Sequence, residues 1–576
     1  MTYLSGKCLE ENGDLYRQIM DFCYHIAGSA RIAAVSYFDY CPTKTAKTKS
    51  VAEVVLVIHD FPIRIMSYLK TIAGRSILLI VVDQWIFERD VERGFLGEAA
   101  AGTLVFPYVA LRGENYLHEQ EVKLKKRLVL ELLVNLVLSF PELSNSLRIK
   151  PEYFMYEVML NRVRVFPPLA NCVSNFMQHV RPRSENNPTL KGYLDALGQL
   201  STEEKVLLSD DIVMIPKTLV LESKTPKSRL TNISRNASRT FFTPLFQTVP
   251  QLLNIFNQNT EAFPNFQLLN QLKGSQSDRS FFDPQEYVFV PTSKGLVSLA
   301  DRINVDGFVR KKLLGGENGK IKRENLGGFL NDVYLIKVES KSGKKQVLVK
   351  RFKDWSGFKW FPLNLWVLGT RTFAVLGKTR FERECATNEL LSDAGFNVPK
   401  VLHVSQNERL VFMEFIEGEN LISTIKRIGQ SSDKNIDAKD LEKLNRVGEL
   451  LRRVHSMNVA LGDTKPENVI VDPNDNLYLL DFEQASQGGD KSWDIAEFLY
   501  FSGHYLPPLH SNRKAEAIAT AFIIGYLKAG GNVNIIRKAG TSKYTRIFSL
   551  FTAPSVLLAM AEICRNTEPL EEITTG

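Results

Sequence analysis

The segment that decides the fold runs Leu461-Gly-Asp-Thr-Lys-Pro-Glu-Asn-Val-Ile-Val-Asp-Pro-Asn-Asp-Asn-Leu-Tyr-Leu-Leu-Asp-Phe-Glu483. It contains the pattern D-x-K-x-x-N at Asp463, Lys465 and Asn468, and it ends in Asp-Phe-Glu, beginning with Asp481. Two short apolar stretches lie between these parts, separated by Pro, Asn and Asp residues that favour a turn. The sequence therefore predicts a β-hairpin that brings Asn468 and Asp481 together.

These residue types in this order are the set that phosphoryl transfer requires. One carboxylate, Asp463, can orient an attacking hydroxyl group, and Lys465 can offset the charge that develops on the transferred phosphoryl group. Asn468 and Asp481 offer oxygen ligands, which Mg²⁺ prefers. We therefore interpret Asp463 and Lys465 as catalytic residues and Asn468 and Asp481 as metal ligands, with Mn²⁺ as the alternative ion.

Two further parts of a nucleotide site lie upstream. The apolar stretch Val347-Leu-Val-Lys ends in Lys350, which is suited to reach the α- and β-phosphates of ATP. The predicted helix that follows offers Glu384 to pair with this lysine. Gly327 and Gly328 form a turn between two predicted strands, where backbone amides can approach phosphate because glycine has no Cβ.

At these residues the chain resembles the protein-kinase-like superfamily, and within it the atypical small kinases: the KEOPS-complex kinase, the RIO kinases, and the lipopolysaccharide and aminoglycoside kinases. Arg383-Glu-Cys-Ala and Ala394-Gly-Phe-Asn-Val-Pro-Lys-Val resemble a helix and loop of the KEOPS kinase. This register selects Glu384 rather than Glu389 as the partner of Lys350. The resemblance covers about residues 300–530.

The resemblance implies a two-lobed kinase fold with ATP in the cleft. Met413-Glu-Phe-Ile-Glu-Gly resembles the linker between the lobes, so it implies that backbone groups of Glu414 and Phe415 meet adenine. Trp493-Asp-Ile-Ala resembles the motif whose aspartate, here Asp494, braces the catalytic loop.

The sequence departs from protein kinases after Asp481. Glu483 stands where D-F-G has its glycine, and only 12 residues separate Asp481 from Asp494. A long peptide-docking segment is therefore absent. Gly462 replaces the arginine of many protein kinases, whereas Lys465 matches the serine/threonine kinases.

These departures leave the acceptor open. A protein Ser or Thr is the first choice, a small molecule or lipid-linked sugar is the second, and an ATP-hydrolysing scaffold of a complex is the third.

Changes in composition and hydrophobic pattern along the chain predict four parts, and the expected fold class is α+β. An α/β domain with a helical extension is expected at 1–220, a polar basic linker at 221–285, a kinase small lobe at 286–418 and a large lobe at 419–576. Strands are expected at 54–58, 77–82, 332–339, 345–352, 409–415, 467–471 and 476–481, and helices at 119–140, 380–394 and 437–456, with one docking helix near 248–258 in the linker.

The N-terminal part weakly resembles a degenerate nucleotidyltransferase fold. His25-Ile-Ala-Gly-Ser-Ala-Arg is similar to the G-S segment at a helix, and the following strand offers Glu53 as the second metal-binding carboxylate. Val51 occupies the position of the first, so Asp60 or Asp83 would have to compensate for an active two-metal site. A regulatory or docking domain and an unrelated α/β domain are the alternatives.

One charged stretch of this part has a simpler interpretation. The run that begins at Asp90 (Asp-Val-Glu-Arg-Gly) is expected to be a solvated helix face.

The net charge of +8 is concentrated in one region. Residues 341–380 hold ten Lys or Arg and one acid, and three of the five tryptophans lie within 354–378. This insertion suits either a hydrophobic lid or a contact with a membrane surface or an acidic partner. Nucleic acid is not indicated, because no RNA-binding motif accompanies the basic residues.

The compartment is expected to be the cytoplasm. Six scattered cysteines indicate reduced thiols, and we find neither a secretion signal nor an apolar run long enough to span a membrane.

Overall fold

The computed structural model describes residues 13–28, 31–39, 51–62, 64–165, 173, 188–223, 225, 283–327, 331–341, 343–354, 374, 376–432 and 435–569. The chain divides into two compact units, Met1–Phe289 and Val290–Gly576. The predicted docking helix near 248–258, nearly all of the linker and most of the insertion at 354–378 lie outside the described residues.

Unit 1 is built on a five-stranded sheet in the order β3-β4-β2-β1-β5. Its strands are β1 (Ile32–Asp39), β2 (Val51–Ile58), β3 (Ile65–Ile72), β4 (Arg75–Asp83) and β5 (Val109–Arg112). β2 and β4 are parallel and the other pairs are antiparallel. The predicted β-branched strands at 54–58 and 77–82 lie in these two central strands and are buried along their length, as strands covered on both faces should be.

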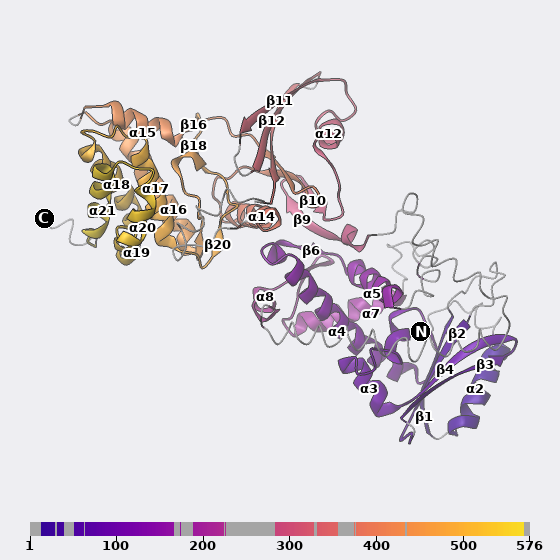
Figure 1. Ribbon diagram of the computed structural model, residues 1–576. Helices are drawn as coiled ribbons and strands as arrows, with labels where there is room; N and C mark the ends of the chain where they lie inside the picture. Colours follow the sequence, from indigo (N-terminus) through magenta and orange to yellow (C-terminus); the bar gives the residue numbers. More distant parts are fainter. Residues whose placement is uncertain are drawn as a thin grey trace. The chain divides into compact units, whose positions relative to one another are not determined.

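Helices cover this sheet and extend beyond it (Figure 1). They are α2 (Gly13–Ala27), α3 (Gln84–Arg93), α4 (Glu114–Ser139), α5 (Pro151–Val165), α7 (Pro188–Thr202) and α8 (Lys217–Ser223). α4 is the long helix predicted at 119–140. A small sheet of β6 (Arg148–Ile149), β7 (Leu207–Ser209) and β8 (Ile212–Met214) lies among them, and the first residues of β9 (Val288–Thr292) pair with β6.

The charged run from Asp90 is solvated at Glu92 and Arg93, as predicted, but the prediction is wrong for Asp90 itself. Asp90 is fully buried on α3, and its carboxylate accepts hydrogen bonds from four backbone N–H groups: those of Leu96, Glu98, Ala100 and Ala101. Gly94, with φ of 65°, ends the helix and turns the following loop back over Asp90. The buried carboxylate therefore satisfies the backbone donors of a buried loop.

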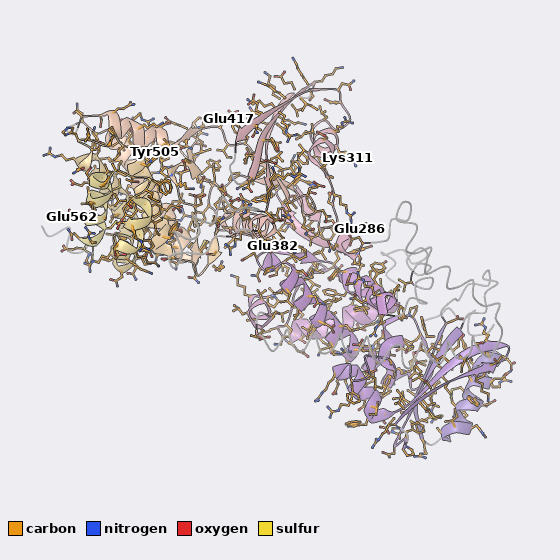
Figure 2. The ribbon with its side chains drawn as sticks, viewed as in Figure 1. Glu286, Lys311, Glu382, Glu417, Tyr505 and Glu562 are labelled. Carbon is orange, nitrogen blue, oxygen red and sulfur yellow. The ribbon has the colours of Figure 1, made fainter. Side chains whose placement is uncertain are left out.

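The small lobe of unit 2 is an antiparallel sheet in the order β11-β12-β13-β15-β14 (Figure 1). Its strands are β11 (Lys320–Gly327), β12 (Asn331–Ser340), β13 (Gly343–Phe352), β14 (Val401–Ser405) and β15 (Leu410–Glu414). The predicted strands at 332–339, 345–352 and 409–415 are β12, β13 and β15. The helix α14 (Gly377–Asp393), predicted at 380–394 and marked by Glu382 in Figure 2, packs against β13 and β15.

One face of this sheet is covered by residues that precede it. The short helix α12 (Val305–Phe308) and the turn η8 (Val309–Leu313) pack on the sheet, and the ring of Phe308 stacks on Phe412 at 4.0 Å. β10 (Gly295–Ser298) comes before them in the chain.

The large lobe is mainly helical (Figure 1), and its buried side chains form one continuous hydrophobic core. Its helices are α15 (Leu421–Gln430), α16 (Ala438–Ser456), α17 (Lys491–His504), α18 (Asn512–Lys528), α19 (Val533–Ala539), α20 (Ser542–Phe548) and α21 (Pro554–Arg565). α16 and α18 cross closely at Gly448 and Gly525, where an added Cβ would lie 2.0 Å from Phe522 O and 1.9 Å from Asn445 O, respectively.

Short strands complete the lobe: β16 (Glu419–Asn420), β17 (Val459–Ala460), β18 (Val469–Val471), β19 (Leu477–Leu479) and β20 (Ser486–Gln487). β18 and β19 form the predicted hairpin, which pairs Val469 with Leu479 and Val471 with Leu477. The first strand is shorter than predicted, because Pro466–Asn468 form a helical turn before it.

No helix in the described part of the chain is both long and apolar enough to cross a bilayer.

Candidate active site

A buried charge cluster joins the two lobes of unit 2. Lys350 near the end of β13 places its Nζ 3.1 Å from Glu384 Oε2 on α14 and 2.5 Å from Asp481 Oδ1 on the large lobe. Glu483 Oε2 lies 3.7 Å from the same nitrogen. Three of the residues predicted from separate parts of the sequence therefore meet at one point.

Burial and charge compete at this cluster. Burial opposes the charge of Lys350, but the carboxylates of Asp481, Glu384 and Glu483 outweigh it and raise the pKa of the lysine. Burial also raises the pKa of Glu384 above its usual value, against the attraction of Lys350. The lysine is thus held as a cation that can face phosphate groups.

The segment after Asp481 is fixed by hydrogen bonds. Asp481 has a φ of 61°, a conformation that non-glycine residues rarely adopt. Phe482 is fully buried and donates its backbone N–H to Glu384 Oε2 at 2.9 Å. Glu384 therefore holds both Lys350 and the backbone that carries Asp481.

Sequence reasoning missed two residues of this cluster. Arg380 on α14 is fully buried and donates to Glu483 Oε1 at 3.2 Å and to Asn331 Oδ1 at 2.8 Å, while Asn331 donates to Glu483 Oε2. The available signal was helical spacing, since Arg380 lies four residues before Glu384 and therefore on the same face of α14.

The catalytic loop between β17 and β18 carries the second group of predicted residues. Lys465 Nζ lies 3.0 Å from Asp463 Oδ1. Burial opposes the charge of this lysine, but Asp463, followed by Glu497 and Glu467, raises its pKa. Asn468 Nδ2 donates to the backbone carbonyl of Asp463 at 2.9 Å.

The hairpin connects this loop to the charge cluster. The backbone N–H of Leu480 donates to the carbonyl of Asn468 at 2.9 Å, so Asn468 and Asp481 leave the hairpin at the same end. The predicted convergence of Asn468 and Asp481 is therefore present in the fold.

Asp494 braces the catalytic loop in the manner that the resemblance implied. Its carboxylate accepts the backbone N–H groups of Leu461 and Gly462 at 2.7 and 2.8 Å and lies 3.0 Å from His455 Nε2. Thr464 adds a hydrogen bond from its hydroxyl to the Asp494 carbonyl at 2.7 Å. At the other end of the loop, the hydroxyl of Tyr505, labelled in Figure 2, donates to Glu467.

The residues predicted to contact the rest of the nucleotide lie in the small lobe. Gly327 ends β11 with a φ of 86°, whereas Gly328 lies outside the described residues. Glu414 ends β15, and its N–H donates to Lys400 O at 2.9 Å, so this N–H already has an acceptor. Phe415 follows in the linker, where Glu417, labelled in Figure 2, accepts a hydrogen bond from Gln346 at 3.1 Å.

The donor set fits Mg²⁺. Asn468 uses its amide nitrogen on Asp463, so the amide oxygen is the atom left to bind a cation. The side chain of Asp481 is 30% exposed, so it is accessible although it pairs with Lys350. A carboxylate and a carboxamide oxygen are ligands that a hard cation prefers, with phosphate oxygens and water completing its shell.

The N-terminal carboxylates do not form a comparable site. Glu53 is buried in the middle of β2, and Asp60 is exposed in a turn. Asp83 caps α3 by accepting the N–H of Trp85, and its other oxygen accepts the N–H of Phe61. Among the residues that the structure describes, His, Cys, Asp and Glu form no metal-binding group of three or more. Gly28 follows the end of α2 instead of beginning a helix.

Comparison with known proteins finds similarities to part of this unit. Residues 371–497 match the model of the RIO domain, a range that includes Glu384, the catalytic loop and Asp481 but not Lys350. A KEOPS complex subunit, Bud32, from Pyrococcus abyssi is 27% identical over 110 residues, which are 19% of this chain and 46% of the relative.

Two protein kinases are also similar. Serine/threonine-protein kinase D from Synechocystis is 29% identical over 165 residues (28% of this chain and 29% of the relative), and dual specificity protein kinase zakA from Dictyostelium discoideum is 28% identical over 122 residues (21% and 15%). The chain thus covers less than half of the length of each of these three relatives. These similarities confirm the resemblance drawn from the sequence: unit 2 carries a protein-kinase-like domain of the atypical small-kinase branch.

Proposed function

We propose that unit 2 is an ATP- and Mg²⁺-dependent phosphotransferase that moves the γ-phosphoryl group of ATP to a hydroxyl group. The observation that carries this proposal is the position of Lys350, which contacts Glu384 on one lobe and Asp481 on the other. A lysine in this position can hold phosphates beside a metal-binding carboxylate. The similarity of residues 371–497 to the RIO domain supports the same activity.

Each polar residue has a defined task in this reaction. Asp463 orients the acceptor hydroxyl and accepts its proton while the new oxygen–phosphorus bond forms, the bond from the γ-phosphorus to the β,γ-bridging oxygen breaks, and ADP leaves. Lys465, 3.0 Å from Asp463, offsets the negative charge on the phosphoryl oxygens. Asn468 and Asp481 would hold Mg²⁺, which would neutralise charge on the phosphates. Lys350, held by Glu384, fixes the phosphates in line with the hydroxyl.

A protein Ser or Thr remains our first choice of acceptor. The printed names of two relatives, a serine/threonine-protein kinase and a dual specificity protein kinase, support it. The short segment between Asp481 and Asp494 favours a small-molecule acceptor instead, because β20 pairs with β17 and leaves little of this segment for binding a peptide. The Bud32 relative is named as a complex subunit, which favours a role within an assembly, as in our third choice.

Incubation of the full chain with γ-labelled ATP and a cell extract separates these acceptors. Label on protein supports the first choice, label on a small molecule the second, and label only in free phosphate the third. Asp463→Ala is expected to abolish every transfer while ATP binding persists, because Asp463 contacts the hydroxyl and not the nucleotide. Transfer that persists in this variant would refute the role of Asp463.

Other features of the sequence remain predictions. The tryptophans of 354–378 are expected to contact a membrane surface or an acidic partner if they do not form a lid. A vesicle flotation assay that compares the wild type with a Trp360→Ala, Trp366→Ala double variant tests this contact. A wild type that does not float with the vesicles would refute binding to a membrane. A cytoplasmic location and use of Mn²⁺ are likewise untested.

A further inference from the structure

Glu483, which replaces the glycine of D-F-G, is buried and hydrogen-bonded within the charge cluster. Glu483 is 3% exposed, and the groups that contact its carboxylate oxygens are the donors Asn331 and Arg380, with Lys350 at 3.7 Å. An un-ionised carboxyl group would need an acceptor for its proton, whereas these contacts all suit an ionised carboxylate.

The charges of the cluster are unequal when Asp481 belongs to it. Two cations, Lys350 and Arg380, face three carboxylates, those of Glu384, Asp481 and Glu483. If Asp481 turns to a metal ion, two cations and two carboxylates remain, and the buried charges balance. Lys350 would then still have two carboxylate partners.

We propose that Glu483, fixed by Arg380 and Asn331, is a positioning residue that allows Asp481 to pass from Lys350 to Mg²⁺. In the arrangement described here Asp481 is bound by Lys350 at 2.5 Å, so a metal ion must compete with the lysine for this carboxylate. Glu483 weakens the hold of Lys350 on Asp481 because it supplies the lysine with another negative partner. This inference rests on the proposed function.

Hydrogen bonds hold the backbone around Glu483, so the transfer from Lys350 to the metal ion is a movement of the Asp481 side chain alone. Gln484 exchanges two hydrogen bonds with the backbone of Ala374, at 2.9 and 3.3 Å. Further along, β20 pairs with β17, and the N–H of Gly488 donates to Asn458 O at 2.7 Å. The segment is therefore held on both lobes, and a movement of the whole segment would break these bonds.

The experiment measures binding of a non-hydrolysable ATP analogue to the full chain, with and without Mg²⁺. In the wild type, Mg²⁺ is expected to tighten binding of the analogue. Glu483→Gln keeps the shape of the side chain but removes its charge, so the tightening by Mg²⁺ should fall about tenfold, within the usual range of coupling between two ligands. Affinity without Mg²⁺ should stay within about twofold.

The matched control is Glu408→Gln, which removes a carboxylate from an exposed pair with Arg351 on the same lobe and should leave both affinities unchanged. Equal loss of affinity with and without Mg²⁺ in Glu483→Gln would mean a structural role only and would overturn the proposal. Unchanged coupling would overturn it too. A wild type that fails to bind the analogue would refute the proposed function, and the role of Glu483 with it.

A second variant covers the case in which Glu483→Gln does not fold. Asn331→Ser removes a donor to Glu483 and leaves the carboxylate in place, so a smaller loss of the Mg²⁺ effect is expected. An Mg²⁺ effect equal to that of the wild type in this variant would refute the role of the Asn331 contact and the proposal with it.

Discussion

Substitution of Asp494 by Asn tests whether one buried carboxylate holds the catalytic loop in place. The two oxygens of Asp494 accept the N–H groups of Leu461 and Gly462, and His455 contacts one of them. Asparagine has nearly the same shape but only one acceptor oxygen. Its NH₂ group would therefore face a backbone N–H that has lost its acceptor.

The cost can be worked from these contacts. One buried N–H without a partner costs about 1–3 kcal/mol, and the remaining hydrogen bond loses its charge assistance. Asp494 is fully buried, so water cannot replace the lost acceptor. We expect Asp494→Asn to lower the free energy of unfolding of unit 2 by roughly 2–4 kcal/mol. Phosphoryl transfer should fall with it, because Asp463 directly follows Gly462.

Urea denaturation of the full chain, monitored with a spectroscopic probe in unit 2, measures this decrease in the free energy of unfolding. Asp472→Asn is the control in a wetter place, since Asp472 in the hairpin turn is partly exposed, accepts two backbone N–H groups on Oδ1 at 2.9 and 2.7 Å, and accepts the amide N–H of Asn476 on Oδ2 at 3.0 Å. The control should cost less than about 1 kcal/mol, because one oxygen keeps both backbone hydrogen bonds and water can replace the acceptor that the Asn476 amide loses. Equal losses in the two variants would refute the argument from burial.

Three further outcomes are expected. Lys350→Met leaves buried carboxylates without their cation and should lower the free energy of unfolding by about 3–5 kcal/mol and abolish nucleotide binding; an unchanged denaturation midpoint would contradict the cluster. Phe308→Ala removes a ring stacked on Phe412 at 4.0 Å and should cost about 3–5 kcal/mol in the same assay, whereas a loss below 1 kcal/mol would mean that α12 does not hold the small lobe. Asp490 caps α17. Burial opposes the ionised carboxylate of Asp490, but the Tyr544 hydroxyl and nearby lysines outweigh burial and lower the pKa of this carboxyl group. The stabilisation by Asp490 is therefore present above the pKa of the unfolded state and is lost as the pH falls through the pKa of the folded state. Asp490→Ala should therefore be about 1 kcal/mol less stable at pH 7, with a difference that narrows below about pH 4, and a pH-independent difference would contradict this reasoning.

The kinase-like unit could be predicted from sequence because its polar residues occur at fixed local spacings. Asp463, Lys465 and Asn468 lie within six positions, and a hairpin of predictable turn chemistry brings Asp481 to them. The pairing of Lys350 with Glu384 followed from the resemblance to the KEOPS kinase, which fixes the register of α14. In these places local pattern and tertiary contact agree.

The rest depends on contacts between distant positions. Arg380 meets Glu483 across 103 positions: its helical spacing from Glu384 indicates a shared face of α14, but nothing local shows that Glu483 is its partner. The prediction for Asp90 is wrong for a related reason. The partners of Asp90 are backbone N–H groups of a loop, and the pattern of side chains in the sequence does not reveal such partners. Polar residues buried by such contacts look the same in sequence as solvated ones.

The most direct test of the central claim is a crystal structure of the full chain with Mg²⁺ and a non-hydrolysable ATP analogue. We expect one nucleotide in unit 2, with Lys350 on its phosphates, and a metal ion bound by the amide oxygen of Asn468 and the carboxylate of Asp481. A nucleotide bound elsewhere, or one whose phosphates contact neither Lys350 nor a metal held by Asp481, would contradict it.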